Sequence, residues 1–189
     1  KYYYPKEFMA SLMSSVMENV SKFSEYILNC RRMMNIAVLP PDINEGESGF
    51  SVSGGGIRYG LSAIKSVGKP VVDAILEERA KNGKFRTMED FINRMPQREV
   101  NRRTLENFIK SGALDSLPGT RRQKMAVGPA LLENKARERK NAFEGQLSLF
   151  DIAGEEEKKE FEVVFPDVGE YAKEELLAFE KDILGVYIS

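Results

Sequence analysis

Residues 63–70 read Ala-Ile-Lys-Ser-Val-Gly-Lys-Pro, and this stretch decides how the middle of the chain is expected to fold. A short helix ends, a tight turn follows, and Pro70 suits the first turn of a new helix because no N–H is needed there. Backbone N–H groups in such a turn lie at the positive end of the next helix dipole and can hold a phosphate oxygen. Gly68 lets a ligand approach the backbone closely, and Lys65 and Lys69 add positive charge.

The turn resembles the helix-hairpin-helix motif of DNA-binding proteins, whose hairpin reads hydrophobic-x-Gly-hydrophobic-Gly. Ser66 stands where the motif has its first glycine. The alternative interpretation is an ordinary corner between two helices. The resemblance makes this turn a candidate phosphate site, formed by Lys65, Ser66, Val67, Gly68 and Lys69.

A second, weaker copy follows at residues 102–115, where a helix, a glycine-containing turn and a new helix start are again predicted. Residues 109–111 (Ile-Lys-Ser) repeat residues 64–66. Two such turns on one compact unit can contact both strands across a minor groove and read the backbone rather than the bases. The candidate DNA-binding residues here are Arg102, Arg103, Lys110, Ser111 and Gly112.

Charge is distributed unevenly along the chain, although the net charge is only −1. Residues 58–140 carry 19 Lys and Arg against 10 Asp and Glu, whereas residues 144–189 carry 4 against 13. A basic block beside an acidic segment indicates a polyanionic partner for the block. The alternative is a solvated surface whose two parts attract each other.

Several kinds of chemistry are disfavoured by the composition. The chain has no histidine, which removes the commonest general base and metal ligand, and its single cysteine, Cys30, cannot form an intrachain disulfide. Zinc is therefore improbable, and a reducing, cytoplasmic compartment is expected. No signal peptide or membrane span is predicted. Because the chain begins with Lys1 and not with Met, we expect a fragment of a longer protein.

The flanking segments predict a mainly α fold of small helical modules with a short β-hairpin and a tandem helix-hairpin-helix unit. Pro5 opens a helix with an apolar face, Ser21 is expected to cap a second helix, and a strand is predicted at 36–39. Residues 50–59 alternate in strand fashion around Gly54-Gly55-Gly56, which predicts a hairpin. The further predicted helices are 60–65, 70–82, 87–94, 101–111, 121–141 and 171–184.

A third motif follows the basic block. Gln146, Leu147, Ser148, Leu149 and Phe150 form a short apolar peptide in otherwise polar sequence. An extended peptide of this kind can dock alternate side chains into pockets of a partner protein. Such pentapeptides are common by chance, so the pattern alone predicts only an exposed docking segment.

Together these stretches resemble the alpha subunit of bacterial DNA polymerase III, the C-family replicative polymerase, over essentially the whole chain. The similar stretches are 4–10, 38–44, 57–65, 101–115, 146–150 and 184–189. The resemblance implies the end of a fingers domain at 1–57, a tandem helix-hairpin-helix unit at 58–118 and a basic helix at 119–144. It further implies a peptide at 145–151 that binds the sliding clamp, and at 152–189 an acidic linker and a helix leading to a truncated OB-fold domain.

The implied role is non-catalytic. In the family, nucleotidyl transfer uses palm-domain carboxylates that hold Mg²⁺, and this chain has no palm domain and no Asp-x-Asp pair. We therefore expect no catalytic residue, no cofactor and no metal in this segment of a nucleotidyltransferase. The expected partners are double-stranded DNA without sequence preference, the sliding clamp and other replicase subunits, at the bacterial nucleoid. The alternatives are a free-standing helix-hairpin-helix DNA-binding or repair protein and a scaffold that binds only proteins.

Overall fold

The structure, a computed structural model, describes residues 3–17, 19–96, 98–143 and 163–188. The described elements, in chain order, are α1 (Pro5–Ser15), α2 (Val20–Met33), β1 (Val38–Leu39), β2 (Ser51–Ser53), β3 (Gly56–Arg58), the 3₁₀ turn η1 (Leu61–Ala63), α3 (Lys69–Asn82), α4 (Met88–Arg94), α5 (Arg102–Lys110), α6 (Arg121–Phe143) and α7 (Lys173–Leu184). The predicted fold class, mainly helical with a short hairpin, is confirmed. None of these described helices is long and apolar enough to cross a membrane.

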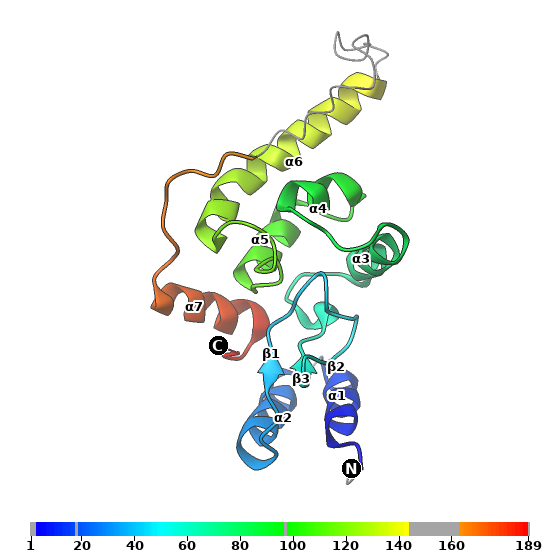
Figure 1. Cartoon of the computed structure of the whole chain (residues 1–189), viewed down its shortest axis with the longest axis vertical. Helices are drawn as coiled ribbons and strands as arrows, with labels where there is room; N and C mark the ends of the chain where they lie inside the picture. Colours follow the sequence, from blue (N-terminus) through cyan, green and yellow to red (C-terminus); the bar gives the residue numbers. More distant parts are fainter. Residues whose placement is uncertain (1–2, 18, 97, 144–162, 189) are drawn as a thin grey trace.

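Helices α1 and α2 lie side by side at one end of the molecule, beneath the small sheet (Figure 1). Pro5 occupies the first turn of α1, as predicted. The cap of α2 differs from the prediction, because Asn19 and not Ser21 precedes the helix. The side chain of Asn19 accepts the N–H of Lys22 at 3.1 Å. Asparagine is as good a cap as serine, so the helix starts two residues earlier than predicted.

The sheet has the strand order β1-β3-β2, with β1 parallel and β2 antiparallel to β3. Gly54 and Gly55 form the turn of the predicted hairpin with φ of 56° and 80°, which only glycine adopts readily. A cluster of aromatic rings joins α2 to the sheet, with ring centroids 4.9 to 5.5 Å apart, and consists of Phe23, Phe50 and Tyr59. This end of the molecule therefore shares one hydrophobic core with the rest.

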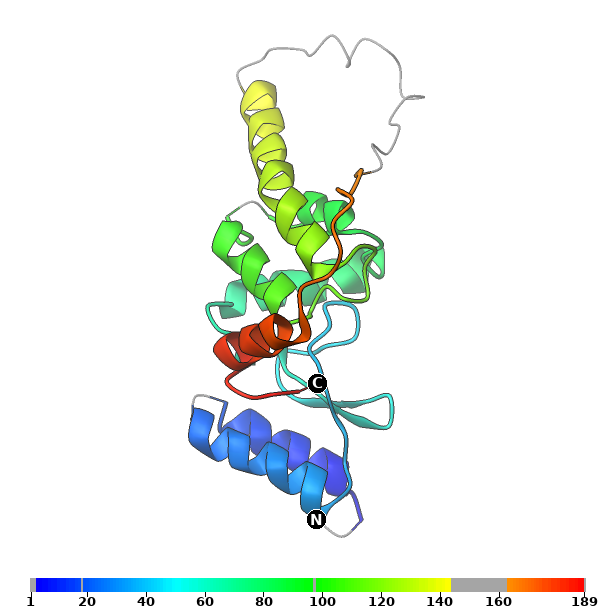
Figure 2. The same ribbon diagram turned by 90° about the vertical axis from the view of Figure 1, so that its left-hand side faces the viewer.

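Above the sheet lie α3, α4 and α5, and α6 extends away from them (Figures 1 and 2). The helices predicted at 70–82, 87–94, 101–111 and 121–141 are confirmed, whereas the one predicted at 60–65 is only a 3₁₀ turn. Two buried lysines fix α6 to the neighbouring elements. Lys124 donates to the carbonyls of Leu114 and Leu117 at 2.7 and 2.8 Å, and Lys135 donates to the carbonyls that end α4.

After α6 the described chain resumes at residue 163 and returns to the start of that helix (Figure 1). The carboxylate of Glu170 accepts the N–H groups of Arg121 and Arg122 at 2.9 and 3.1 Å, so it caps α6 from a distant part of the sequence. Burial alone would raise the pKa of Glu170, but these N–H groups and that of Tyr171 hold its pKa below the usual value.

Helix α7 then packs against α5 and brings the C-terminal residues back to the sheet. The hydroxyl of Tyr59 donates to the carbonyl of Leu184 at 2.9 Å, and Arg31 of α2 donates to the carbonyl of Tyr187 at 3.0 Å. Segments from both ends of the sequence therefore support the middle of the molecule, where the predicted hairpins lie.

Candidate nucleic-acid interface

The first hairpin, residues 64–68, connects η1 to α3 and is anchored by two apolar side chains. Ile64 and Val67 are buried, and the N–H of Val67 donates to the carbonyl of Ile64 at 3.1 Å, which closes a tight turn. Between them Ser66 has φ of 61°. A non-glycine residue in this left-handed conformation costs about 1–2 kcal/mol. Ser66, which stands where the motif has its first glycine, therefore adopts a conformation that glycine reaches without steric cost.

The outer face of this hairpin offers unpaired hydrogen-bond donors. Within the described residues, the backbone N–H groups of Ser66, Gly68 and Lys69 have no acceptor. These three residues are exposed, and Gly68 directly precedes α3, at the positive end of its dipole. Exposed N–H groups at a helix N-terminus suit a phosphate oxygen. The turn predicted from the sequence therefore has backbone donors that no described group occupies.

The two lysines of this hairpin differ in their environment. Lys69 is exposed and makes no ion pair with any described residue. The ammonium of Lys65 lies 2.6 Å from Oδ1 of Asp182 in α7. The hydrogen bond from Lys65 holds the pKa of Asp182 below its usual value, and the nearby charge of Lys110 adds to this effect. Both partners of the ion pair are more than half exposed, so an incoming phosphate can displace the carboxylate.

The second hairpin, residues 111–113, is closed to ligands. Ser111, Gly112 and Ala113 are buried, and their N–H groups donate to carbonyls of α5 at 2.9 to 3.1 Å. The guanidinium of Arg121 covers the turn and donates to the carbonyl of Lys110 at 3.1 Å. The expectation that backbone amides of Ser111 and Gly112 hold phosphate therefore does not fit this geometry.

The predicted helix start directly after Gly112 is also wrong, since residues 111–116 form successive turns and α6 begins only at Arg121. Gly112 still has the positive φ expected of a hairpin glycine, 82°. The second copy keeps a tight turn, but its backbone N–H groups are bonded to carbonyls inside the molecule and are not available at the surface.

The three basic candidates near the second hairpin have different surroundings. Arg103 is exposed and has no partner among the described residues. Arg102 is exposed as well, and its Nε donates to Glu106 at 3.0 Å. Lys110 is half-buried, with its ammonium 5.6 Å from the centre of the Phe179 ring in α7. Arg103 is therefore the most available of the three for contact with a polyanion.

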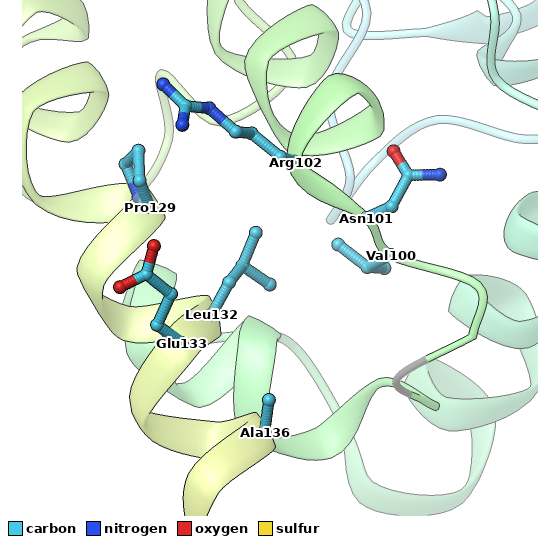
Figure 3. Close-up of a pocket in the computed structure, with 7 residues that line it drawn as sticks. All are labelled: Val100, Asn101, Arg102, Pro129, Leu132, Glu133 and Ala136. Atoms are coloured by element: carbon cyan, nitrogen blue, oxygen red, sulfur yellow. The ribbon is translucent and has the colours of Figure 1, made fainter.

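A cavity of about 270 Å³ lies between the start of α5 and the middle of α6 (Figure 3). Val100, Leu132 and Pro129 supply its apolar wall, and the polar groups at its edge belong to Asn101, Arg102 and Glu133. Pro129 lies inside α6, which continues through it. Across the described residues no group of three or more Cys, Asp or Glu side chains could hold a metal ion. The candidate clamp-binding residues 146–150 lie outside the described part of the chain.

Three residues that the sequence did not indicate shape this interface: Asn107, Arg121 and Asp182. Asn107 is a polar residue among the buried apolar positions of α5, and that mismatch was the one visible signal. Arg121 and Asp182 belong to charged stretches in which no single residue stands out.

Comparison with known proteins agrees with this geometry. A family described as "Helix-hairpin-helix motif" matches residues 35–124, which include both hairpins. Proteins named DNA polymerase III subunit alpha match nearly the whole chain. The one from Borreliella burgdorferi is 39% identical over 98% of the chain, that from Thermus aquaticus 40% over 100%, and that from Chlamydia trachomatis 36% over 98%.

The chain spans only 15 to 16% of the length of these relatives. Both the identity and the coverage of this chain are high enough to establish common ancestry, and the matched residues include the exposed first hairpin. The chain therefore belongs to the family of bacterial DNA polymerase III alpha subunits and corresponds to one segment of them.

Proposed function

We propose that this segment binds the sugar-phosphate backbone of duplex DNA through the first hairpin, as a non-catalytic part of a replicative DNA polymerase. The observation that carries the proposal is the exposed turn at the start of α3, where the N–H groups of Ser66, Gly68 and Lys69 lack acceptors. These groups can bind a phosphate oxygen at any base sequence, so the binding is expected to be independent of sequence.

Side chains around the turn extend the contact. Lys69 and Arg103 are exposed and unpaired among the described residues, and Lys65 becomes available when Asp182 is displaced. Each phosphate neutralised releases counterions, which makes the affinity fall with salt. The closed second hairpin acts as support, and Arg102 and Lys110 are secondary contacts.

The experiment is a salt titration of the chain with a fluorescent duplex of about 20 base pairs. Log K is expected to fall linearly with log salt, by about 0.9 per phosphate contacted. Lys69→Ala should weaken binding and make this slope shallower by about 0.9. Lys81→Ala is the matched control, because Lys81 is an exposed lysine in the last turn of the same helix.

Equal effects of Lys69→Ala and Lys81→Ala, or an affinity that does not depend on salt, would contradict phosphate binding by the first hairpin. Binding to proteins but not to DNA would favour the protein-only scaffold. Tight binding to one sequence would contradict binding through the backbone alone.

The clamp contact is a second part of the proposal. Residues 146–150 follow α6, which at 23 residues is about 35 Å long and extends away from the hairpins. A peptide beyond this helix can bind the sliding clamp while the first hairpin holds DNA. Two weak sites joined in one chain raise each other's effective concentration, which lengthens residence on DNA.

The polymerase reaction itself is assigned to the much longer parent protein, at the bacterial nucleoid with other replicase subunits. The relatives are named as polymerase subunits, and the chain spans about one sixth of their length. The Mg²⁺ that the reaction uses in this family is likewise assigned to the palm domain of the parent protein.

A further inference from the structure

The peptide group between Lys65 and Ser66 is held from inside the molecule by Asn107. The side-chain Nδ2 of Asn107 donates to the carbonyl of Lys65 at 2.6 Å. Asn107 lies in α5, in the second hairpin unit, and only 7% of it is exposed. A buried amide that points at the backbone of the other hairpin unit links the two units directly.

This hydrogen bond also fixes the direction of the Ser66 N–H. The chain contains no cis peptide bond in its described residues, and in a trans peptide the C=O and N–H point in opposite directions. With the carbonyl of Lys65 directed to Asn107, the N–H of Ser66 is directed away from the core. That N–H is one of the exposed donors that lack an acceptor within the described chain.

The turn at residues 64–67 could adopt a second backbone conformation, which the hydrogen bond from Asn107 disfavours. It is closed by the bond from Val67 to Ile64, and Ser66, its third residue, has positive φ as in a type II turn. Rotation of the Lys65–Ser66 peptide would give a type I turn with negative φ, which serine prefers. That rotation would break the bond to Asn107 and turn the Ser66 N–H away from the DNA side.

We propose that Asn107 is a positioning residue for phosphate binding, which keeps the Ser66 N–H pointing outward by holding the carbonyl of Lys65. The inference rests on the proposed function of the first hairpin. On the other side of Lys65, its N–H donates to the carbonyl of Ile183 in α7 at 3.1 Å. Helices α5 and α7 thus hold the residue before Ser66 from both sides, and leave the outer face free.

The test compares duplex affinity of four variants of the chain at fixed low salt. Asn107→Ala should lose about tenfold in affinity, equivalent to about 1.4 kcal/mol, which one hydrogen bond to a charged group can contribute. Ser66→Gly alone is the reference for the double variant, since it keeps the backbone N–H of residue 66 and glycine favours the type II turn by itself. The double variant, Asn107→Ala with Ser66→Gly, should regain most of the lost affinity for the same reason.

Asn107→Asp is the second variant at this position, because it keeps the volume of the side chain and removes the donor. It should lose at least as much affinity as Asn107→Ala, since its carboxylate repels the carbonyl of Lys65. Circular dichroism checks that each variant is folded, and the NMR shift of the Ser66 amide in the free chain reports whether the peptide has rotated.

Rescue by Ser66→Gly separates positioning from support of the core, because a variant that had merely lost packing would gain nothing from glycine. Normal affinity of both Asn107 variants, together with weakened binding by Lys69→Ala, would overturn the inference and leave the proposed function intact. The same holds if Ser66→Gly fails to rescue. If neither Lys69→Ala nor Asn107→Ala changes the affinity, the proposed phosphate binding by the first hairpin is wrong, and so is the positioning role of Asn107.

Discussion

The guanidinium of Arg121 lies on the carboxylate of Asp115, with Nη2 2.6 Å from Oδ2 and Nε 3.0 Å from Oδ1. This two-point contact holds Arg121 over the second hairpin, where only 9% of it is exposed. The arginine takes the place that a ligand would need beside Gly112. One of two sequence-related turns is thus closed by its own chain and the other is open.

The closed turn predicts an unequal response of two glycines to alanine. A Cβ on Gly112 would collide with Nη2 of Arg121 and come within 3.0 Å of Asp115, at φ of 82°. Gly55, at φ of 80°, has nothing within 4 Å of the same position and serves as the control. Urea unfolding should show a loss of about 1 kcal/mol for Gly55→Ala and about 2–4 kcal/mol for Gly112→Ala. Equal losses would mean that Arg121 moves aside freely.

The ion pair between Lys65 and Asp182 predicts a variant with increased DNA affinity. Asp182→Asn removes the carboxylate that holds Lys65, so the duplex should bind about two- to threefold more tightly at low salt. The dependence of log K on log salt should steepen by about 0.9 as Lys65 gains a phosphate. Glu174→Gln removes the same charge from the first turn of α7 and should change the slope less. A weaker-binding Asp182→Asn would show that α7 supports the hairpin chiefly through this pair.

The buried Lys135 predicts a pH-dependent stability. Burial lowers its pKa to about 8, whereas in the unfolded chain it lies near 10.4. Between these values the unfolded state binds more protons, so the free energy of unfolding rises with pH, by up to about 3 kcal/mol for this group. Below about pH 8 both states are protonated and the contribution stays constant. Chemical unfolding at pH 7 to 10 should show this rise relative to Lys135→Met, and parallel curves would contradict it.

If residues 146–150 bind the sliding clamp, substitutions in them should remove clamp binding and leave duplex binding unchanged. Leu149→Ala with Phe150→Ala should abolish binding of the chain to the sliding clamp in surface plasmon resonance, because the apolar anchors are lost. Duplex affinity should stay within about twofold, since these residues carry no charge. Leu147→Ala is a milder variant of the same peptide. Clamp binding that survives the double substitution would place the contact elsewhere.

The helices and the hairpin could be predicted because their signals are local. Apolar residues at three-four spacing gave α3, α5 and α6 to within about two residues, and Gly54 and Gly55 placed the hairpin turn. The cap at Asn19 was missed since Ser21 offers the same chemistry two residues later. Residues 60–65 are helical in pattern but too short, so only a 3₁₀ turn forms.

The site was predicted only in part, because contacts with residues far along the sequence set the conformation and the accessibility of its turns. Ser66 has a positive φ, which serine itself disfavours. The residue before it, Lys65, is held by Asn107, 42 positions after Lys65, and by Ile183 in α7. No local pattern reveals such contacts. The closing of the second turn likewise depends on Arg121, whose direction is set by Asp115.

The capping of α6 by Glu170 has a mechanical consequence. The chain leaves the body along α6 and comes back to the first turn of the same helix, where Glu170 accepts the N–H groups of Arg121 and Arg122. Any pull on the returning segment is therefore opposed first by the two hydrogen bonds between Glu170 and α6, which lie only three residues before the start of α7.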